Sequence, residues 1–129
     1  MNEITILHLK GTLIAPIQVE LHDKAALNLQ EEILRRIEQR EATGLIIDIS
    51  AISIVDSFMA RLLADTAKSA RLMGVETVLV GMRKEVVITL IQLGMSLSGV
   101  ETALNMEEGM ELLDQLREKA AWADDSGAH

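Results

Sequence analysis

The chain has 129 residues, of which 49% are hydrophobic and 25% are charged, so it has the size and composition of one compact domain. Its net charge of -8 repels the phosphate backbone of nucleic acids, and one Phe, one Trp and no Tyr leave few rings on which bases could stack. The absence of cysteine excludes disulfides, thiolate metal sites and cysteine nucleophiles.

The amino terminus lacks the pattern of a targeting sequence. The first ten residues include Glu3 and alternate in polarity, whereas a signal peptide has a basic segment followed by an apolar run. No stretch reaches the roughly 18 apolar residues that a membrane helix requires. We therefore expect a cytoplasmic protein.

The first predicted elements are two short strands. Residues 4–9 alternate between the two sides of a strand, and Gly11 permits a turn. Residues 12–17 then predict a second strand, whose far end is limited by Pro16 because proline cannot donate to a strand ladder. Together they predict an opening hairpin.

A helix and a buried strand are predicted next. Residues 23–42 place apolar side chains on one face, with Asp23 as a candidate N-cap and Gly44 beyond the end. Residues 45–49 form a short apolar run, interrupted by Asp48, which is typical of a strand covered on both faces.

The second half of the chain continues this alternation. Its pattern predicts helices over residues 57–73 and 85–93, with strands over residues 75–80 and, more weakly, 100–104. Asn105 and Glu108 have the spacing of a capping box at the start of a last helix. The buried stripe of that helix is predicted to be Met110, Leu113 and Leu116.

This order of elements predicts an α/β fold in a single domain. The sheet is expected to be mixed but mostly parallel, opened by the amino-terminal hairpin and accompanied by about four helices. We expect the domain to span residues 1–122. Residues 123–129 have no apolar period and are predicted to form a flexible tail.

Most kinds of catalytic or binding chemistry find no support in the sequence. His8, His22 and His129 lie far apart without carboxylates at ligand spacing, so we predict no metal site. Neither a G-x-S-x-G nucleophile motif nor a glycine-rich phosphate loop occurs, and we predict no cofactor. Paired carboxylates such as Glu31 with Glu32 suit exposed helix turns better than acid-base catalysis.

The segment 51–61 (AISIVDSFMAR) is the one that folding alone does not explain. Its simplest interpretation is structural: either Asp56 or Ser57 caps the following helix by accepting a backbone hydrogen bond. The functional interpretation begins from the same position, because the first turn of a helix presents free N–H groups and the positive end of the helix dipole. A phosphate on Ser57 would be stabilised there and would change the charge of any surface around it.

Two neighbours of Ser57 are further candidates. Arg61 could steady a phosphate, although an ion pair with Asp65, four residues on, is the commoner outcome for such an arginine. Phe58, the only phenylalanine, lies beside the apolar stripe of its helix and could either anchor a partner or pack against the preceding loop. The predicted partner-binding residues are Asp56, Ser57, Phe58 and Arg61.

With these residues in place, the chain resembles the STAS family, and within it the RsbS group of stressosome scaffolds. The resemblance extends from the opening hairpin to Leu116. Its most specific parts are residues 45–50 (LIIDIS) and 54–58 (IVDSF), supported by residues 81–83 (GMR) and 93–94 (LG).

The resemblance implies a non-enzymatic regulator of the stress response that acts by partner switching. Ser57 would be phosphorylated by an RsbT-like serine kinase, which the scaffold holds before phosphorylation and releases after it. The scaffold would assemble with RsbR-like STAS sensor paralogues, and an RsbX-like phosphatase would reset Ser57. An RsbR-type subunit has an amino-terminal sensor domain, so a chain that begins at the hairpin is expected to be the short scaffold.

Two other classes of function remain open from the sequence. An anti-sigma factor antagonist of the SpoIIAA or RsbV kind would bind an anti-sigma kinase directly, but such proteins usually have Asp-Ser-Ser-Gly at the helix start. Here Phe58 and Met59 follow Asp56 and Ser57. A small hydrolase or nucleotide-binding enzyme would require clustered polar residues, which the sequence lacks.

Overall fold

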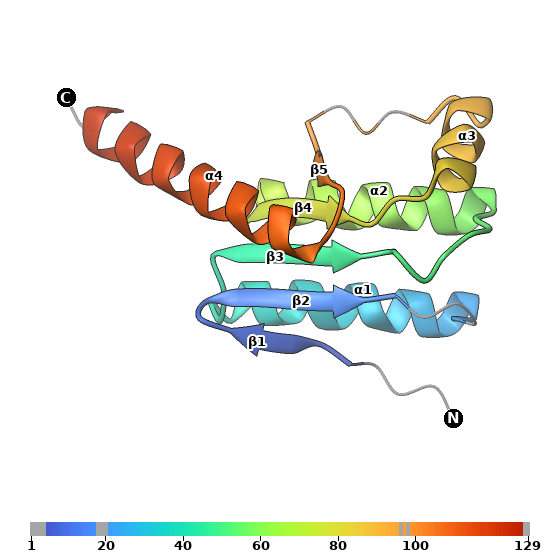
Figure 1. Ribbon diagram of the computed structural model, residues 1–129. Helices are drawn as coiled ribbons and strands as arrows, with labels where there is room; N and C mark the ends of the chain where they lie inside the picture. The colour runs from blue at the N-terminus through green and yellow to red at the C-terminus, as the bar shows by residue number, and fades with distance from the viewer. Residues whose placement is uncertain (1–4, 18–20, 96, 98, 128–129) are drawn as a thin grey trace.

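The computed structural model describes residues 5–17, 21–95, 97 and 99–127. Strands and helices alternate along most of the chain (Figure 1). In chain order the elements are β1 (Leu7–Leu9), β2 (Thr12–Pro16), α1 (Asp23–Glu38), β3 (Gly44–Asp48), α2 (Ser57–Leu72), β4 (Glu76–Val80), α3 (Lys84–Gln92), β5 (Glu101–Ala103) and α4 (Met106–Gly127).

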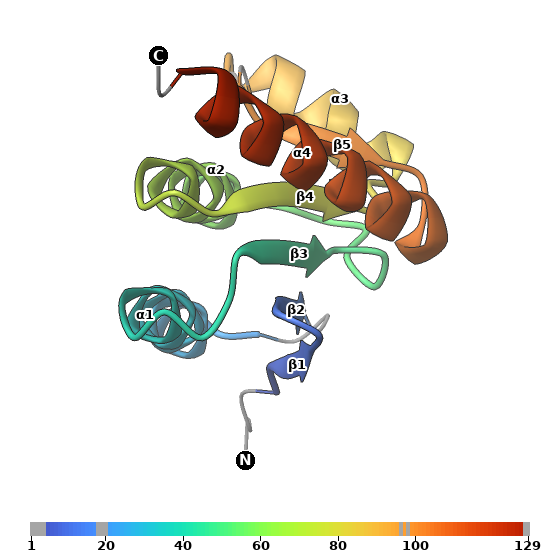
Figure 2. The same ribbon diagram turned by 90° about the vertical axis from the view of Figure 1, so that its left-hand side faces the viewer.

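One five-stranded sheet forms the centre, with its strands in the order β1-β2-β3-β4-β5. β1 and β2 are antiparallel, with His8 opposite Leu13, whereas each later pair is parallel. The predicted α/β fold, with four helices and a mixed sheet opened by a hairpin, is confirmed. Figure 2 shows α1 and α2 on one side of the sheet and α4 on the other.

β3 lies at the middle of these layers. Leu45 and Ile47 belong to the core beneath α1 and α2, while Ile46 packs with Leu113 of α4 in a second cluster. Each of these side chains is at most 1% exposed. Burying an aliphatic side chain contributes roughly 1.5 to 3 kcal/mol, so this strand holds both layers to the sheet. The prediction that it is covered on both faces is confirmed.

α4 packs closely against the sheet because Gly109 faces Val80: a Cβ at Gly109 would collide with the valine side chain. Farther along α4, Arg117 Nη2 donates a hydrogen bond to the hydroxyl of the buried Thr12 in β2. The predicted stripe is only partly the buried face, since Leu113 is fully buried and Met110 and Leu116 are half-buried.

Both ends of α1 differ from the sequence prediction. The N-cap of α1 is His22, which makes no side-chain cap bond, and Asp23 is the first helical residue. Asp23 still stabilises the start of the helix, because a carboxylate in the first turn complements the helix dipole. α1 also ends at Glu38 rather than at residue 42, and Arg40 adopts a positive φ of 62° in the turn that follows.

The start and end of α4 were predicted with unequal success. Glu108 N–H donates to Asn105 Oδ1 at 2.9 Å, as the capping-box spacing predicts. In a full capping box the Glu108 side chain would accept the backbone N–H of Asn105. Here it accepts from the side chain instead, because Asn105 Nδ2 donates to Glu108 Oε2 at 3.3 Å. The helix continues to Gly127, although its last turns were predicted to be a tail. Alanines at positions 120, 121 and 123 favour the helix without any apolar period. The domain boundary at residue 122 stays a prediction, and residues 128 and 129 lie outside the described chain.

Several strands are also shorter than predicted. β1 begins at Leu7, whereas its predicted start at residue 4 lies outside the described residues. β5 contains three residues instead of the predicted five.

Over the described parts of the chain, no helix combines the length and hydropathy needed to cross a lipid bilayer.

Candidate functional site

The candidate site lies in the connection from β3 to α2, at the carboxyl end of the parallel strands and below α3 (Figure 1). This connection begins with a tight turn. Ser50 N–H donates to Asp48 Oδ1 at 3.0 Å, and Ile52 N–H donates to the Ile49 carbonyl oxygen, also at 3.0 Å. Asp48, which interrupts the apolar run of β3, therefore has a structural role in starting the turn.

The middle of the connection is held by two buried side chains. Ile52 and Val55 are each 5% exposed and belong to the main core. Between them, Ile54 is 88% exposed. Because Ile52 and Val55 are anchored in the core, the backbone between them holds Ile54 in place with its side chain in solvent.

The start of α2 is capped by Asp56. Its Oδ1 accepts the N–H of Met59 at 2.8 Å, and its backbone is extended, as an N-cap residue requires. Ser57 is the first helical residue and is exposed. Of the two cap candidates, Asp56 takes this role, and Ser57 is exposed beside it without making the cap bond.

A second connection, from β4 to α3, braces the first. Arg83 Nε donates to the carbonyl oxygen of Ser50 at 2.9 Å. Gly81 has a positive φ of 78°, and a Cβ there would lie 2.7 Å from the Ser50 Cβ. The two connections therefore approach so closely that only glycine fits at residue 81 without a shift.

The other predicted partner-binding residues take different positions. Phe58 is half-buried, and Arg61 is exposed on the outer side of α2. The expected ion pair of Arg61 with Asp65 is absent from the described residues, whose ion pairs join Glu32 to Arg35 and Arg36. Arg61 thus stays available to an anionic group, while Phe58 presents less surface than Ile54.

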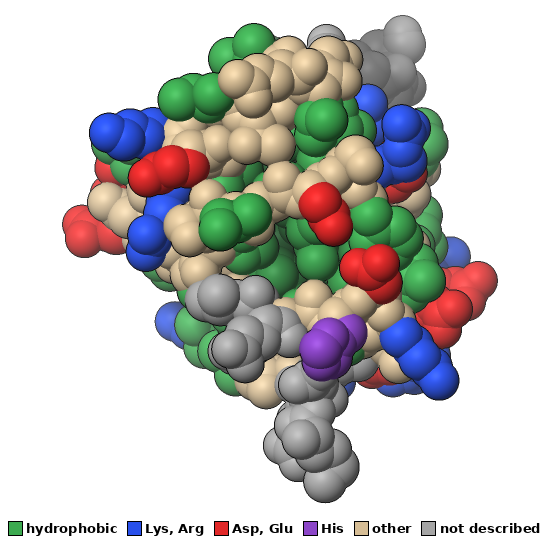
Figure 3. Space-filling view, turned by 90° about the vertical axis from the view of Figure 1, so that its right-hand side faces the viewer, with side chains coloured by type: hydrophobic (Ala, Val, Ile, Leu, Met, Phe, Trp, Pro, Cys, Tyr) green, Lys and Arg blue, Asp and Glu red, His purple; other side chains and the backbone are tan. Residues whose placement is uncertain are grey.

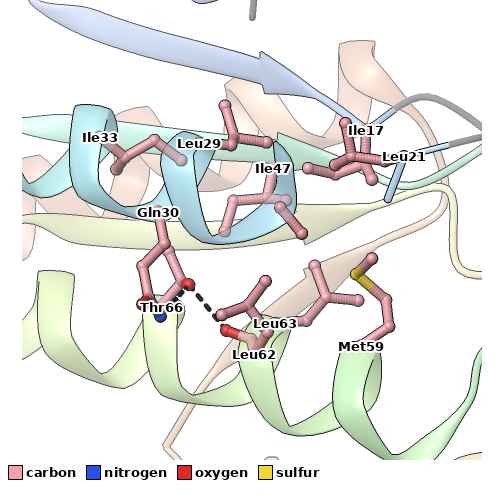
Figure 4. A pocket seen from close by; sticks show the side chains of 11 residues that line it. Ile17, Leu21, Leu29, Gln30, Ile33, Ile47, Met59, Leu62, Leu63 and Thr66 are labelled. Carbon is pink, nitrogen blue, oxygen red and sulfur yellow. Dashed lines mark hydrogen bonds between the residues drawn. The ribbon is translucent and has the colours of Figure 1, made fainter. Parts of the chain in front are cut away.

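Behind the site, α2 packs against α1 through apolar side chains (Figure 4). One polar bridge crosses this interface: Gln30 Nε2 donates to Thr66 Oγ1 at 2.8 Å, and that hydroxyl donates to the Leu62 carbonyl oxygen at 2.7 Å. The space beside Met59 measures about 10 Å³, which is room for no more than a water molecule. This interface is packing and not a ligand site.

α3 adds apolar side chains to the same end of the molecule. Its inner face buries Val86 and Leu90, whereas Val87, Ile88 and Ile91 point outward and are between 38% and 71% exposed. Figure 3 looks onto this end and shows hydrophobic side chains with acidic ones among them. None of these three residues, nor Ile54, is among the predicted partner-binding residues, although an apolar residue outside the buried period of its element is a signal that could have identified them.

This end of the molecule combines exposed apolar side chains with an exposed serine at a helix start. In the described chain, no group of three or more His, Asp or Glu side chains is placed to hold a metal ion. An exposed hydroxyl at a helix start can accept a phosphate, whose charge the free N–H groups of the first turn would stabilise.

Comparisons with known proteins agree with this architecture. The STAS domain model matches residues 3–109. The structure of a serine-to-glutamate variant of RsbS from Moorella thermoacetica superposes with a TM-score of 0.82 at 35% identity, covering 91% of this chain and 99% of that one. A chain from a study of the molecular architecture of the stressosome, a signal integration and transduction hub, gives a TM-score of 0.77 at 38% identity and covers 88% and 98% of the two chains.

A relative from Bacillus subtilis (strain 168) is named RsbT co-antagonist protein RsbRD. It is 29% identical over 100 residues, which are 78% of this chain and 36% of the relative. The chain therefore spans little more than a third of that relative's length.

Proposed function

The chain belongs to the STAS domain family, and on this premise we propose that it is a non-enzymatic partner-switching regulator of the RsbS kind, controlled by phosphorylation of Ser57. The observation that supports this most is the exposed hydroxyl of Ser57 at the first position of α2, beside a cap formed by a different residue. A modification of Ser57 can then change the surface without removing the bond that begins the helix.

The proposed partners follow from the RsbS resemblance and from the relatives. Before phosphorylation, the surface around Ser57 holds an RsbT-like serine kinase. RsbR-like STAS paralogues assemble with the chain, in keeping with the likeness to a stressosome subunit and to a protein named an RsbT co-antagonist. An RsbX-like phosphatase removes the phosphate.

Electrostatics supplies the switch. A phosphate on Ser57 adds roughly -1.5 to -2 charges at neutral pH, next to the carboxylate of Asp56. The amide groups of the first turn of α2 stabilise this charge in the free protein, but a docked kinase would have to bury it. Phosphorylation therefore favours the separated proteins.

The alternative is an anti-sigma factor antagonist of the SpoIIAA or RsbV kind, which uses the same switch on a different partner. The identity to RsbS over nearly the whole chain favours the scaffold. Binding of a purified anti-sigma kinase, without binding of an RsbT-type kinase, would favour the alternative.

The test is to incubate the chain with its RsbT-type kinase and ATP and then to map phosphate by mass spectrometry. We expect one phosphate at Ser57, none on a Ser57→Ala variant, and kinase release on phosphorylation. Ser53, four residues earlier and half-buried, provides a matched control as Ser53→Ala, which should be phosphorylated normally. Phosphate only at another residue would contradict the proposal.

A further inference from the structure

We propose that Ile54 is the apolar anchor by which the serine kinase recognises the Ser57 site. This inference rests on the proposed function and assigns the contact to a residue outside the predicted set of Asp56, Ser57, Phe58 and Arg61. Ile54 lies three residues before the acceptor serine and is 88% exposed.

The backbone around Ile54 is fixed on both sides. Ile52 and Val55 are buried in the core, and beyond them the chain is tied by the Asp48–Ser50 turn and by the Asp56 cap. Isoleucine is itself restricted at χ1 because it is branched at Cβ. Binding of a partner to Ile54 therefore costs little conformational entropy, because the backbone and side chain there are already restricted, and this favours affinity.

Exposure of one apolar residue is common and does not by itself indicate a contact. Leu72, at the end of α2, is as exposed as Ile54 at 89%. The difference is position: Leu72 lies at the opposite end of α2 from Ser57, whereas Ile54 lies in the connection that leads directly to Ser57. A kinase whose active site reaches the Ser57 hydroxyl must cover the surface beside it.

The position of the anchor also explains why a phosphate three residues away would release the kinase. Contacts of an apolar side chain require that water leave the surrounding surface. A phosphate on Ser57 stays hydrated, because burying its charge without an opposite charge is unfavourable, so water would remain on the surface beside Ile54. The anchor and the charge therefore compete for the same area.

The experiment measures the dissociation constant of the RsbT-type kinase by calorimetry, with a non-hydrolysable ATP analogue so that Ser57 stays unmodified. We expect Ile54→Ser to weaken binding roughly 10- to 100-fold, as loss of a buried isoleucine contact would. Ile54→Val should restore most of the affinity, and Leu72→Ser, the matched control, should bind like the wild type. All three variants should keep the wild-type Tm, since both positions are exposed.

The outcomes separate this inference from the proposed function. If the kinase binds and phosphorylates the wild-type chain at Ser57 but binds Ile54→Ser equally well, the anchor is wrong and the switch stands. Equal weakening by Ile54→Ser and Leu72→Ser would also overturn the anchor, because the effect would not be local. If the wild-type chain neither binds the kinase nor is phosphorylated, both proposals fail.

Discussion

The guanidinium of Arg83, just before α3, donates its Nε–H to the carbonyl oxygen of Ser50, just after β3, at 2.9 Å. The two residues are 33 positions apart, and their bond joins the connections that follow two neighbouring parallel strands. The segment that presents Ser57 is thus braced from outside its own sequence.

Removing this brace should loosen the site more than the fold. We expect Arg83→Ala to lower the free energy of unfolding by about 1 kcal/mol, the contribution of a single exposed hydrogen bond. Amide hydrogen exchange should become faster in residues 50–56 while β3 stays protected. Arg83→Lys, which keeps the charge but lacks Nε, should behave like alanine; a wild-type exchange pattern in both variants would show that the bond does not brace the loop.

Gly81 offers a sharper test of the close approach to Ser50. Gly81→Ala places an alanine at a positive φ, which destabilises the fold by about 1 to 2 kcal/mol. It also introduces a Cβ that would lie 2.7 Å from the Ser50 Cβ and 3.0 Å from the Ser50 backbone. Gly94 is the matched control, because its φ is also positive and a Cβ there meets nothing within 4 Å. Chemical denaturation should show a larger loss for Gly81→Ala, and equal losses would contradict the proposed crowding.

Asp56 should contribute to stability through its cap. Asp56→Ala removes the acceptor for the Met59 N–H, so we expect a loss of about 0.5 to 2 kcal/mol in urea denaturation. Asp56→Asn keeps an acceptor oxygen and should lose much less. If the two variants were equally destabilised, the contribution would come from the charge and not from the cap bond.

Ser57 should matter little for stability and greatly for regulation. Since it is exposed and is not the cap, Ser57→Ala should change the free energy of unfolding by no more than about 0.5 kcal/mol. It should hold the kinase permanently, and Ser57→Asp should lower kinase affinity only in part, because one carboxylate has less charge than a phosphate. Kinase release from Ser57→Ala in the presence of ATP would contradict the switch.

Two surface ion pairs, of Glu32 with Arg35 and with Arg36, should make a small, acid-sensitive contribution to stability. Hydrogen bonds from Arg35 and Arg36 lower the pKa of Glu32 from 4.5 to about 2. A lowered carboxyl pKa stabilises the fold above pH 4.5, and this stabilisation is lost as the pH falls from 4.5 towards 2. Glu32→Gln should therefore lose less stability over this range than the wild type, and the difference should shrink in high salt because the two ion pairs are at the surface. Identical acid curves would show that the two ion pairs contribute nothing measurable.

Much of the fold was predictable because the decisive signals are local. The apolar run around Ile46 predicted a strand with two covered faces, which the structure confirms, whereas Gly44 did not mark the end of α1, because it is the first residue of β3. Where local signals allow several outcomes, the prediction was less exact: His22 rather than Asp23 occupies the N-cap position of α1, and α4 continues through an alanine-rich stretch that has no apolar period.

The functional site shows the same division. The sequence by itself determined that Ser57 stands at a helix start after a buried strand, because residue periodicity and cap chemistry act over a few neighbouring positions. Only the tertiary structure decided that Asp56 makes the cap, that Arg83 reaches Ser50, and that Ile54 points outward while Ile52 and Val55 are buried. The last two outcomes depend on how the sheet and α3 pack around the connection, and that packing is settled by contacts between residues far apart in the chain.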